Sequence, residues 1–121
     1  MQSKPEINQD HRGSLYEAFK LENDGQVFVI TILPNKTRGN HYHKRKIEKF
    51  LVVFGSAQIA NRNRETEAVD YFNVKAENPE TITITPNNTH SITASEEGCI
   101  LVCWVSEQFD ESDPDTFAEE V

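Results

Sequence analysis

The sequence between residues 37 and 55 reads TRGNHYHKRKIEKFLVVFG and contains two of the four histidines of the chain. His41 and His43 are two residues apart, so on a β-strand both imidazoles would point to the same face. Glu48 follows after four intervening residues, and His90 lies far along the chain. Imidazole and carboxylate groups bind Zn, Fe, Mn, Ni or Cu, so these four residues predict a divalent metal site. We expect zinc, although the ligand types alone do not choose among these ions.

Apolar residues on both sides of this stretch follow the pattern of β-strands. They alternate with polar residues or form short continuous runs, and no segment keeps the 3.6-residue period of a helix. The segment 99–105 is the most apolar, and we expect it to be a central strand with Trp104 in the core. Turn residues predict chain breaks at 55–56, 78–79, 86–88 and 97–98. This spacing predicts an all-β sandwich, jelly roll or small barrel.

The length and the net charge exclude several classes of protein. A chain of 121 residues predicts a single domain over 1–121 and excludes a complete nicotinamide-binding dehydrogenase or kinase. The net charge of -8 argues against binding to nucleic acid or to an anionic membrane. No signal peptide and no apolar run near the roughly 20 residues of a membrane span occur, so we expect a cytoplasmic protein. We expect a loose lead-in over 1–9 and an acidic tail over 108–121.

The two cysteines are expected to be buried, reduced thiols. Cys99 and Cys103 lie four residues apart in the predicted central strand, which places their Cα atoms about 13 Å apart at ~3.3 Å per residue. A disulfide requires a separation below about 7 Å.

The basic residues are concentrated in one part of this acidic chain. Eight of the twelve Lys and Arg residues lie between residues 36 and 64, where Glu48 is the only acidic residue. A run of charge is often a solvated surface, but this window also contains His41 and His43. We therefore expect a local cationic region beside the predicted metal site.

The spacing of the histidines resembles the signature of a known superfamily. His-x-His, four residues, Glu, six residues and Gly, with a later Pro and His before another strand, resembles the two motifs of the cupins. The resemblance implies a cupin double-stranded β-helix, a jelly-roll barrel with its site inside. Asn35 and Asn87 stand where cupins usually have Gly, and because Asn tolerates positive φ we expect both turns to be kept. Ala94 stands where cupins have a polar Asn.

Two families within this superfamily are similar to the chain in further segments. DHRGSLYE at 10–17 and RGNHY at 38–42 resemble motifs of the dTDP-sugar 3,5-epimerases, in which the Arg of the first helps to bind the nucleotide diphosphate and the His of the second is the base. A resemblance over nearly the whole chain is to the C-terminal cupin domain of CapF-type capsular polysaccharide enzymes. It runs through 37–44, 48–53, 107–110 and 114–117.

The CapF-type resemblance implies a metal-binding isomerase. Such a domain epimerises carbon 3 of a UDP-4-keto-6-deoxy-N-acetylhexosamine in capsule or O-antigen biosynthesis. In that family a short-chain reductase domain precedes the cupin and reduces the ketone with NADPH. We expect no nicotinamide cofactor on this chain, and either a separate reductase acting in trans or a different keto sugar as substrate. The family also implies a homodimer.

Proton removal next to a ketone requires a base near the carbon and positive charge near the oxygen. We expect a metal held by the four predicted ligands to supply the charge, with Tyr71 or a water molecule moving the proton. The alternative is a metal-free site with His41 as the base, because a nitrogen bound to a metal cannot also accept a proton. Guanidinium groups bind phosphate oxygens in pairs, and the candidates for the diphosphate are Arg12, Arg38, Arg62 and Arg64.

Two other functions are consistent with the same residues. A sugar 3,4-ketoisomerase also passes through an enediol on a small cupin barrel. A non-catalytic cupin would bind a sugar or a metal without turning over a substrate. Both UDP and dTDP sugars fit the motifs.

Overall fold

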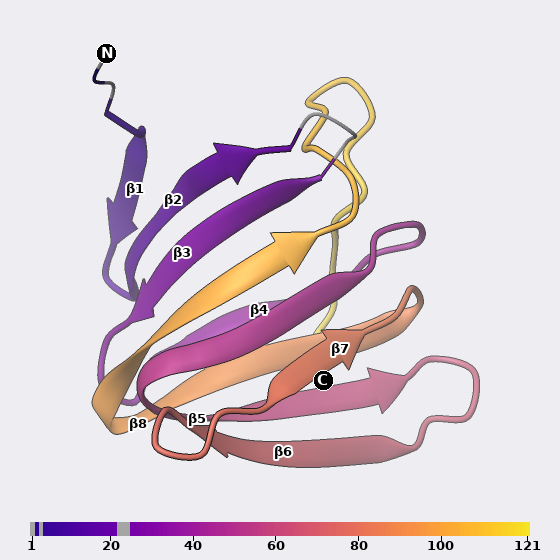
Figure 1. The fold of residues 1–121 in the computed structure, drawn as a ribbon. Coiled ribbons are helices and arrows are strands. Elements are labelled where there is room, and N and C mark those ends of the chain that lie inside the picture. Colours follow the sequence, from indigo (N-terminus) through magenta and orange to yellow (C-terminus); the bar gives the residue numbers. More distant parts are fainter. Residues whose placement is uncertain (1, 3, 22–24) are drawn as a thin grey trace.

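The computed structural model describes residue 2, residues 4–21 and residues 25–121, and the regular structure in these ranges is entirely β-strand. The strands are β1 (Ile7–Asp10), β2 (Gly13–Lys20), β3 (Gln26–Ile32), β4 (Thr37–Tyr42), β5 (Glu48–Asn63), β6 (Val69–Lys75), β7 (Thr81–Ile84), β8 (Asn88–Val105) and β9 (Phe117–Ala118). They form an antiparallel sheet in the order β1-β2-β3-β8-β4-β9, and β5 pairs with β6, β7 and β8. Figure 1 shows how this sheet curls on itself. The all-β, single-domain prediction is confirmed, and the described ranges contain no helix that could cross a membrane.

Two long strands, β5 and β8, run together through the molecule and bend at the same level. Gly55 in β5 has a φ of 71° and Gly98 in β8 has a φ of 77°. A Cβ at Gly55 would lie 2.1 Å from the carbonyl oxygen of Gly98, so a larger residue does not fit there. The predicted chain breaks at 55–56 and 97–98 are therefore wrong, because both glycines bend a strand that continues.

The interior of the curled sheet is filled by apolar side chains from β3, β5 and β8. Ile32, Ile59 and Leu101 are at most 1% exposed, and the core continues around them. Cys99 and Cys103 are buried and free, which confirms that the thiols are not paired.

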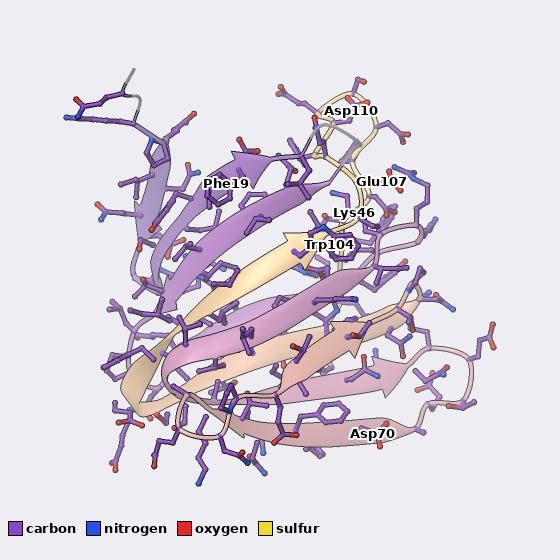
Figure 2. The ribbon with its side chains drawn as sticks, viewed as in Figure 1. Phe19, Lys46, Asp70, Trp104, Glu107 and Asp110 are labelled. Carbon is purple, nitrogen blue, oxygen red and sulfur yellow. The ribbon has the colours of Figure 1, made fainter. Side chains whose placement is uncertain are left out.

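The outer face of β8 is also apolar. In the pairing register Val102 lies between Val29 of β3 and Leu51 of β5, and all three are half-buried. Trp104, at the end of β8 in Figure 2, is half-buried on this face with the Lys49 ammonium 5.6 Å from its ring. The prediction of a central strand is confirmed by the pairing of β8, but the placement of Trp104 in the core is wrong.

Both ends of the chain are more ordered than the sequence indicates. Ile7–Asp10 pairs with β2, so residues 7–9 of the expected lead-in belong to the sheet, while residues 1 and 3 lie outside the described ranges. In the acidic tail, Phe117–Ala118 pairs with β4, and Asp115 is only 1% exposed. The tail is therefore part of the barrel wall.

Candidate metal and anion site

Three strands and one loop bring the four predicted metal ligands together. Gly39 in β4 has a φ of 95°, and the register shifts between Gly39 and His41, which pairs with His90 of β8. A Cβ at Gly39 would lie 2.9 Å from the carbonyl oxygen of His90, so glycine allows the close approach of the two strands. His43 follows the end of β4, and Glu48 is the first residue of β5. Residues far apart in the sequence thus meet on one wall of the barrel.

The donor atoms of these four residues converge on one point. One ligand atom from each of His41, His43, Glu48 and His90 lies within 4.8 Å of the others. The Nε2 atoms of His43 and His90 lie 2.6 and 2.9 Å from the same oxygen of Glu48. The ring centroid of His41 is 4.9 Å from that of His43 and 4.8 Å from that of His90. The convergence that the spacing predicts is present in the fold.

The hydrogen bonds around this cluster fit a bound divalent cation. His43 Nδ1 lies 2.5 Å from the backbone oxygen of Asp115, and His90 Nδ1 lies 3.1 Å from that of Asn88. A ring nitrogen that donates to a carbonyl leaves Nε2 with its lone pair for a metal. The Nε2 atom of His90 is buried and, although it lies 2.9 Å from Glu48, it makes no hydrogen bond of regular geometry with the described residues. A cation between these donors would satisfy it, so the residues present fit the metal that the motif predicts.

Burial and mutual contact shift the pKa values of the cluster in opposite directions. Burial, followed by the charge of His90, lowers the pKa of His41 to about 4. Burial also opposes the charged form of His43, but the hydrogen bond to Glu48, the charge of Glu48 and the hydrogen bond to Asp115 together outweigh it and raise the pKa of His43. Burial disfavours ionisation of Glu48, yet the two imidazoles beside it lower the pKa of Glu48 below its usual range. The carboxylate is therefore ionised, as a metal ligand must be.

A cavity of about 400 Å³ opens beside the cluster. Its walls are largely apolar and include Phe28, Phe50 and Ile92. The polar groups that line it are the three clustered histidines and Glu48, together with three cations, one amide, the hydroxyl of Thr116 and the thiol of Cys103. A ligand in this cavity would be largely shielded from water at the histidines and would meet positive charge on the walls.

Two of the four predicted phosphate-binding arginines line this cavity. Arg38 projects from β4 with its side chain 12% exposed, and its Nε is buried without a hydrogen-bond partner among the described residues. Arg12 lies in the turn between β1 and β2, where its guanidinium pairs with Asp10 at 2.6 Å. Asp10 also lies 3.9 Å from Arg38, so it holds the two guanidinium groups near each other.

The other predicted site residues lie elsewhere. Arg62 and Arg64 both pair with Glu119 of the C-terminal segment, at 3.2 and 2.9 Å, and neither lines the cavity. Tyr71 lies on β6 with 62% of its surface exposed, and it does not line the cavity either. The prediction that Tyr71 moves the proton is wrong for this arrangement, because β6 pairs with the part of β5 that lies beyond the bend at Gly55.

Sequence reasoning missed two residues of the site. Lys46 is 6% exposed and lines the cavity, with its ammonium 5.7 Å from the ring of Phe109. Figure 2 shows Lys46 near the C-terminal segment that carries Phe109. Asp115 contacts the loop between His43 and Glu48. The position of Lys46 between two ligands could have identified it, whereas nothing local distinguishes Asp115 from the other tail acids.

Comparison with known proteins assigns the chain to a family. The family model described as the polysaccharide biosynthesis C-terminal domain matches residues 8–117. The chain belongs to this family. CapF from Staphylococcus aureus, a capsular polysaccharide assembling protein, has a TM-score of 0.93 and 36% identity over 99% of this chain and 34% of that protein. The predicted resemblance to CapF-type cupins is confirmed.

Two further proteins are similar to the chain, one in sequence and one in fold. A Pseudomonas aeruginosa protein named UDP-2-acetamido-2,6-beta-L-arabino-hexul-4-ose reductase is 37% identical over 93% of this chain, which spans 30% of that protein. Oxalate decarboxylase from Bacillus subtilis has a TM-score of 0.80 and 18% identity over 94% of this chain and 30% of its own length. The latter likeness confirms the cupin fold. The chain thus spans about a third of the length of these relatives.

Proposed function

We propose that this chain is a metal-dependent sugar-nucleotide epimerase. Its substrate would be a UDP-4-keto-6-deoxy-N-acetylhexosamine, inverted at carbon 3 during capsule or O-antigen biosynthesis. The observation that carries the proposal is the convergence of three imidazoles and one carboxylate in a cavity that Arg12 and Arg38 also line. Such a site combines a place for a cation with a place for a diphosphate.

The names of the relatives support this choice of substrate. The Pseudomonas relative is named for a UDP-linked 2-acetamido sugar with a carbonyl at carbon 4. The Staphylococcus relative is named for capsular polysaccharide assembly. A ketone at carbon 4 makes the hydrogen on carbon 3 acidic, and loss and return of that proton on opposite faces inverts the carbon.

The residues of the chain divide the chemistry between them. His41, His43, Glu48 and His90 would hold the cation, which when bound polarises the ketone oxygen and stabilises negative charge there. The apolar walls exclude bulk water, which strengthens every charge interaction with the sugar. A water molecule in the cavity would carry the proton. We propose zinc as the cation, because its preferred ligands are of this kind.

His41 also has a competing role as the base of a metal-free site. No hydrogen bond from the described residues anchors its ring, in contrast to those of His43 and His90. Replacement with glutamine separates the two roles. If His41 is a ligand, His41→Gln loses metal and activity together; if it is the base, the variant keeps whatever metal the wild type holds and loses activity alone.

The test of the reaction is incubation with a UDP-4-keto-6-deoxy-N-acetylhexosamine in deuterated water. We expect deuterium at carbon 3, detected by NMR or mass spectrometry. Appearance of a 3-keto isomer would instead select the ketoisomerase. Absence of exchange with both UDP- and dTDP-linked sugars would reject enzymatic turnover and leave a binding cupin.

Elemental analysis tests the metal. The purified wild type should contain about one equivalent of zinc per chain, and His43→Ala should contain much less, because it removes a ligand that is anchored through Asp115. A metal-free wild type with full exchange activity would overturn the metal-dependent mechanism in favour of His41 as the base.

We also propose two kinds of partner. The first is a reductase that acts on the product of this chain, because the Pseudomonas relative is named for a reduction of this kind. A homodimer would cover the apolar outer face of β3, β8 and β5, on which Val29, Val102 and Leu51 adjoin. A strand that is apolar on both faces is normally buried on both.

A further inference from the structure

The loop between two of the proposed ligands is held by a single buried carboxylate. Asp115 is 1% exposed and accepts three backbone hydrogen bonds from successive residues of this loop. Its Oδ1 accepts from the N–H of Lys44 at 2.9 Å, and its Oδ2 accepts from those of Arg45 and Lys46 at 2.9 and 3.0 Å. Hydrogen bonds of this kind, from backbone N–H groups to a carboxylate, are charge-assisted. Asp115 therefore fixes the path of the chain from His43 to Glu48.

The backbone of the same residue orients one of the ligands. His43 Nδ1 lies 2.5 Å from the backbone oxygen of Asp115, and the ring donates to it. This bond turns Nε2 of His43 towards Glu48, 2.6 Å away. Asp115 thus acts on both sides of the cluster, through its backbone on His43 and through its side chain on the loop that leads to Glu48.

Contacts that involve no metal hold Asp115 in place. Phe117 stacks on Tyr42 with a centroid distance of 5.3 Å. The Lys44 ammonium lies 4.5 Å from the centroid of the same Phe117 ring. Ala118 pairs with His41, and the N–H of Glu119 donates to the backbone oxygen of Asn40 at 2.9 Å. The segment that carries Asp115 is therefore anchored along β4 before any cation binds.

We propose that Asp115 is a positioning residue of the metal centre. It acts from 67 or more positions away in the sequence and contacts no metal itself, but it sets the loop and the ring so that His43 and Glu48 meet. The inference rests on the proposed metal site. Its physical basis is preorganisation: a loop that is already fixed loses no further freedom when the cation binds, so affinity rises.

The experiment compares two aspartates of the same segment. Asp115→Asn keeps the backbone carbonyl for His43 but places an amide NH2 opposite at least one loop N–H, so at least one of the three bonds is lost. Asp113→Asn removes the same charge from a side chain that is 71% exposed and pairs with Arg45. The affinities for Zn²⁺ and Co²⁺ are measured by competition with a chelating dye, and the visible absorption spectrum of bound Co²⁺ reports ligand geometry.

We expect Asp115→Asn to bind both ions about 10- to 100-fold more weakly than wild type, with a changed Co²⁺ spectrum, and Asp113→Asn to match wild type. An unchanged affinity and spectrum in Asp115→Asn would overturn the inference even if its melting temperature falls, because Asp115 would then serve the fold alone. Failure of the wild type to bind either ion would overturn the proposed metal site as well.

Should Asp115→Asn fail to fold, amide exchange in the metal-free wild type decides. Slow exchange at Lys44, Arg45 and Lys46 is expected, because Asp115 holds their N–H groups before the cation arrives. Fast exchange that slows only on metal addition would overturn the inference.

Discussion

Replacing Arg38 with alanine should weaken the binding of UDP far more than replacing Arg62 with alanine. The sequence predicts that both residues bind the diphosphate, but in the fold only Arg38 of the two lines the cavity. Arg38 lines the cavity beside the histidines with its side chain 12% exposed. Arg62 pairs with Glu119 at 3.2 Å and does not line the cavity.

The size of the effect follows from the surroundings of Arg38. Its nearest carboxylate among the described residues is Asp10, 3.9 Å away, and its Nε is buried without a partner. A phosphate oxygen would therefore gain a hydrogen bond that no protein group now makes. A hydrogen bond to a charged group contributes about 1.5–3 kcal/mol, which corresponds to a roughly 10- to 150-fold change in Kd. Arg38→Lys should lie between wild type and Arg38→Ala, because lysine keeps the charge and loses the paired geometry.

Isothermal titration of UDP into each variant at low ionic strength measures the effect, with thermal melting as the check on folding. Arg38→Ala should raise the Kd by this factor, and Arg62→Ala should leave it unchanged. Equal losses in the two variants would mean that the diphosphate does not bind in the cavity. No loss in Arg38→Ala would remove this arginine from the anion site.

Three other expectations concern stability and assembly. In the metal-free protein, burial lowers the pKa of His41 to about 4, so stability should fall as the pH drops from 6.5 towards 4. The pKa of His43 is raised in the folded protein, so protonation of His43 stabilises the fold below pH 6.5, and this contribution is lost as the pH rises through the raised value. The melting temperature should therefore peak near pH 6.5. A continued rise of the melting temperature above pH 6.5 would contradict these shifts. Val102→Glu should convert a dimer to monomers in light scattering, whereas Tyr71→Glu, on β6 beyond the bend at Gly55, should not. The opposite result would place the interface on β6. Gly55→Ala should lower the free energy of unfolding, measured with urea, by at least about 3 kcal/mol, because the methyl group would lie 2.1 Å from a carbonyl oxygen at a φ of 71°. A variant as stable as the wild type would refute the close approach.

The convergence of the metal ligands could be predicted because local geometry sets most of it. Residues two apart on a strand share a face, and this placed His41 and His43 together before any fold was known. His90 joined them through a motif that specifies a second strand. Positive φ at Asn35 and Asn87, 62° and 65°, shows that both turns tolerate the exchange of Gly for Asn, as the sequence predicted.

The bends of β5 and β8 could not be predicted from the same kind of pattern. A glycine within an apolar run is compatible with a turn that ends a strand and with a bend that lets it continue. The choice depends on the neighbouring strands: Gly55 pairs with Cys99, next to Gly98, and allows β8 to approach, whereas a Cβ at Gly98 would lie 3.1 Å from the carbonyl oxygen of Ile32 at the end of β3. That relation links residues more than forty positions apart, which no short window of sequence contains.

The acidic tail pairs with part of the cationic window, and this pairing also depends on residues far apart in the sequence. A net charge of -8 with a cationic window predicts a local cationic region beside the metal site, and in the structure the window contains two different groups of cations. Arg45, Arg62 and Arg64 pair with carboxylates of the C-terminal segment on the outside of the barrel. Arg38 and Lys46 line the cavity, and Lys46 forms no ion pair with any residue in the described ranges. Because the tail neutralises the outer cations, the field that an anionic ligand meets is concentrated at the cavity, although the molecule as a whole is negative.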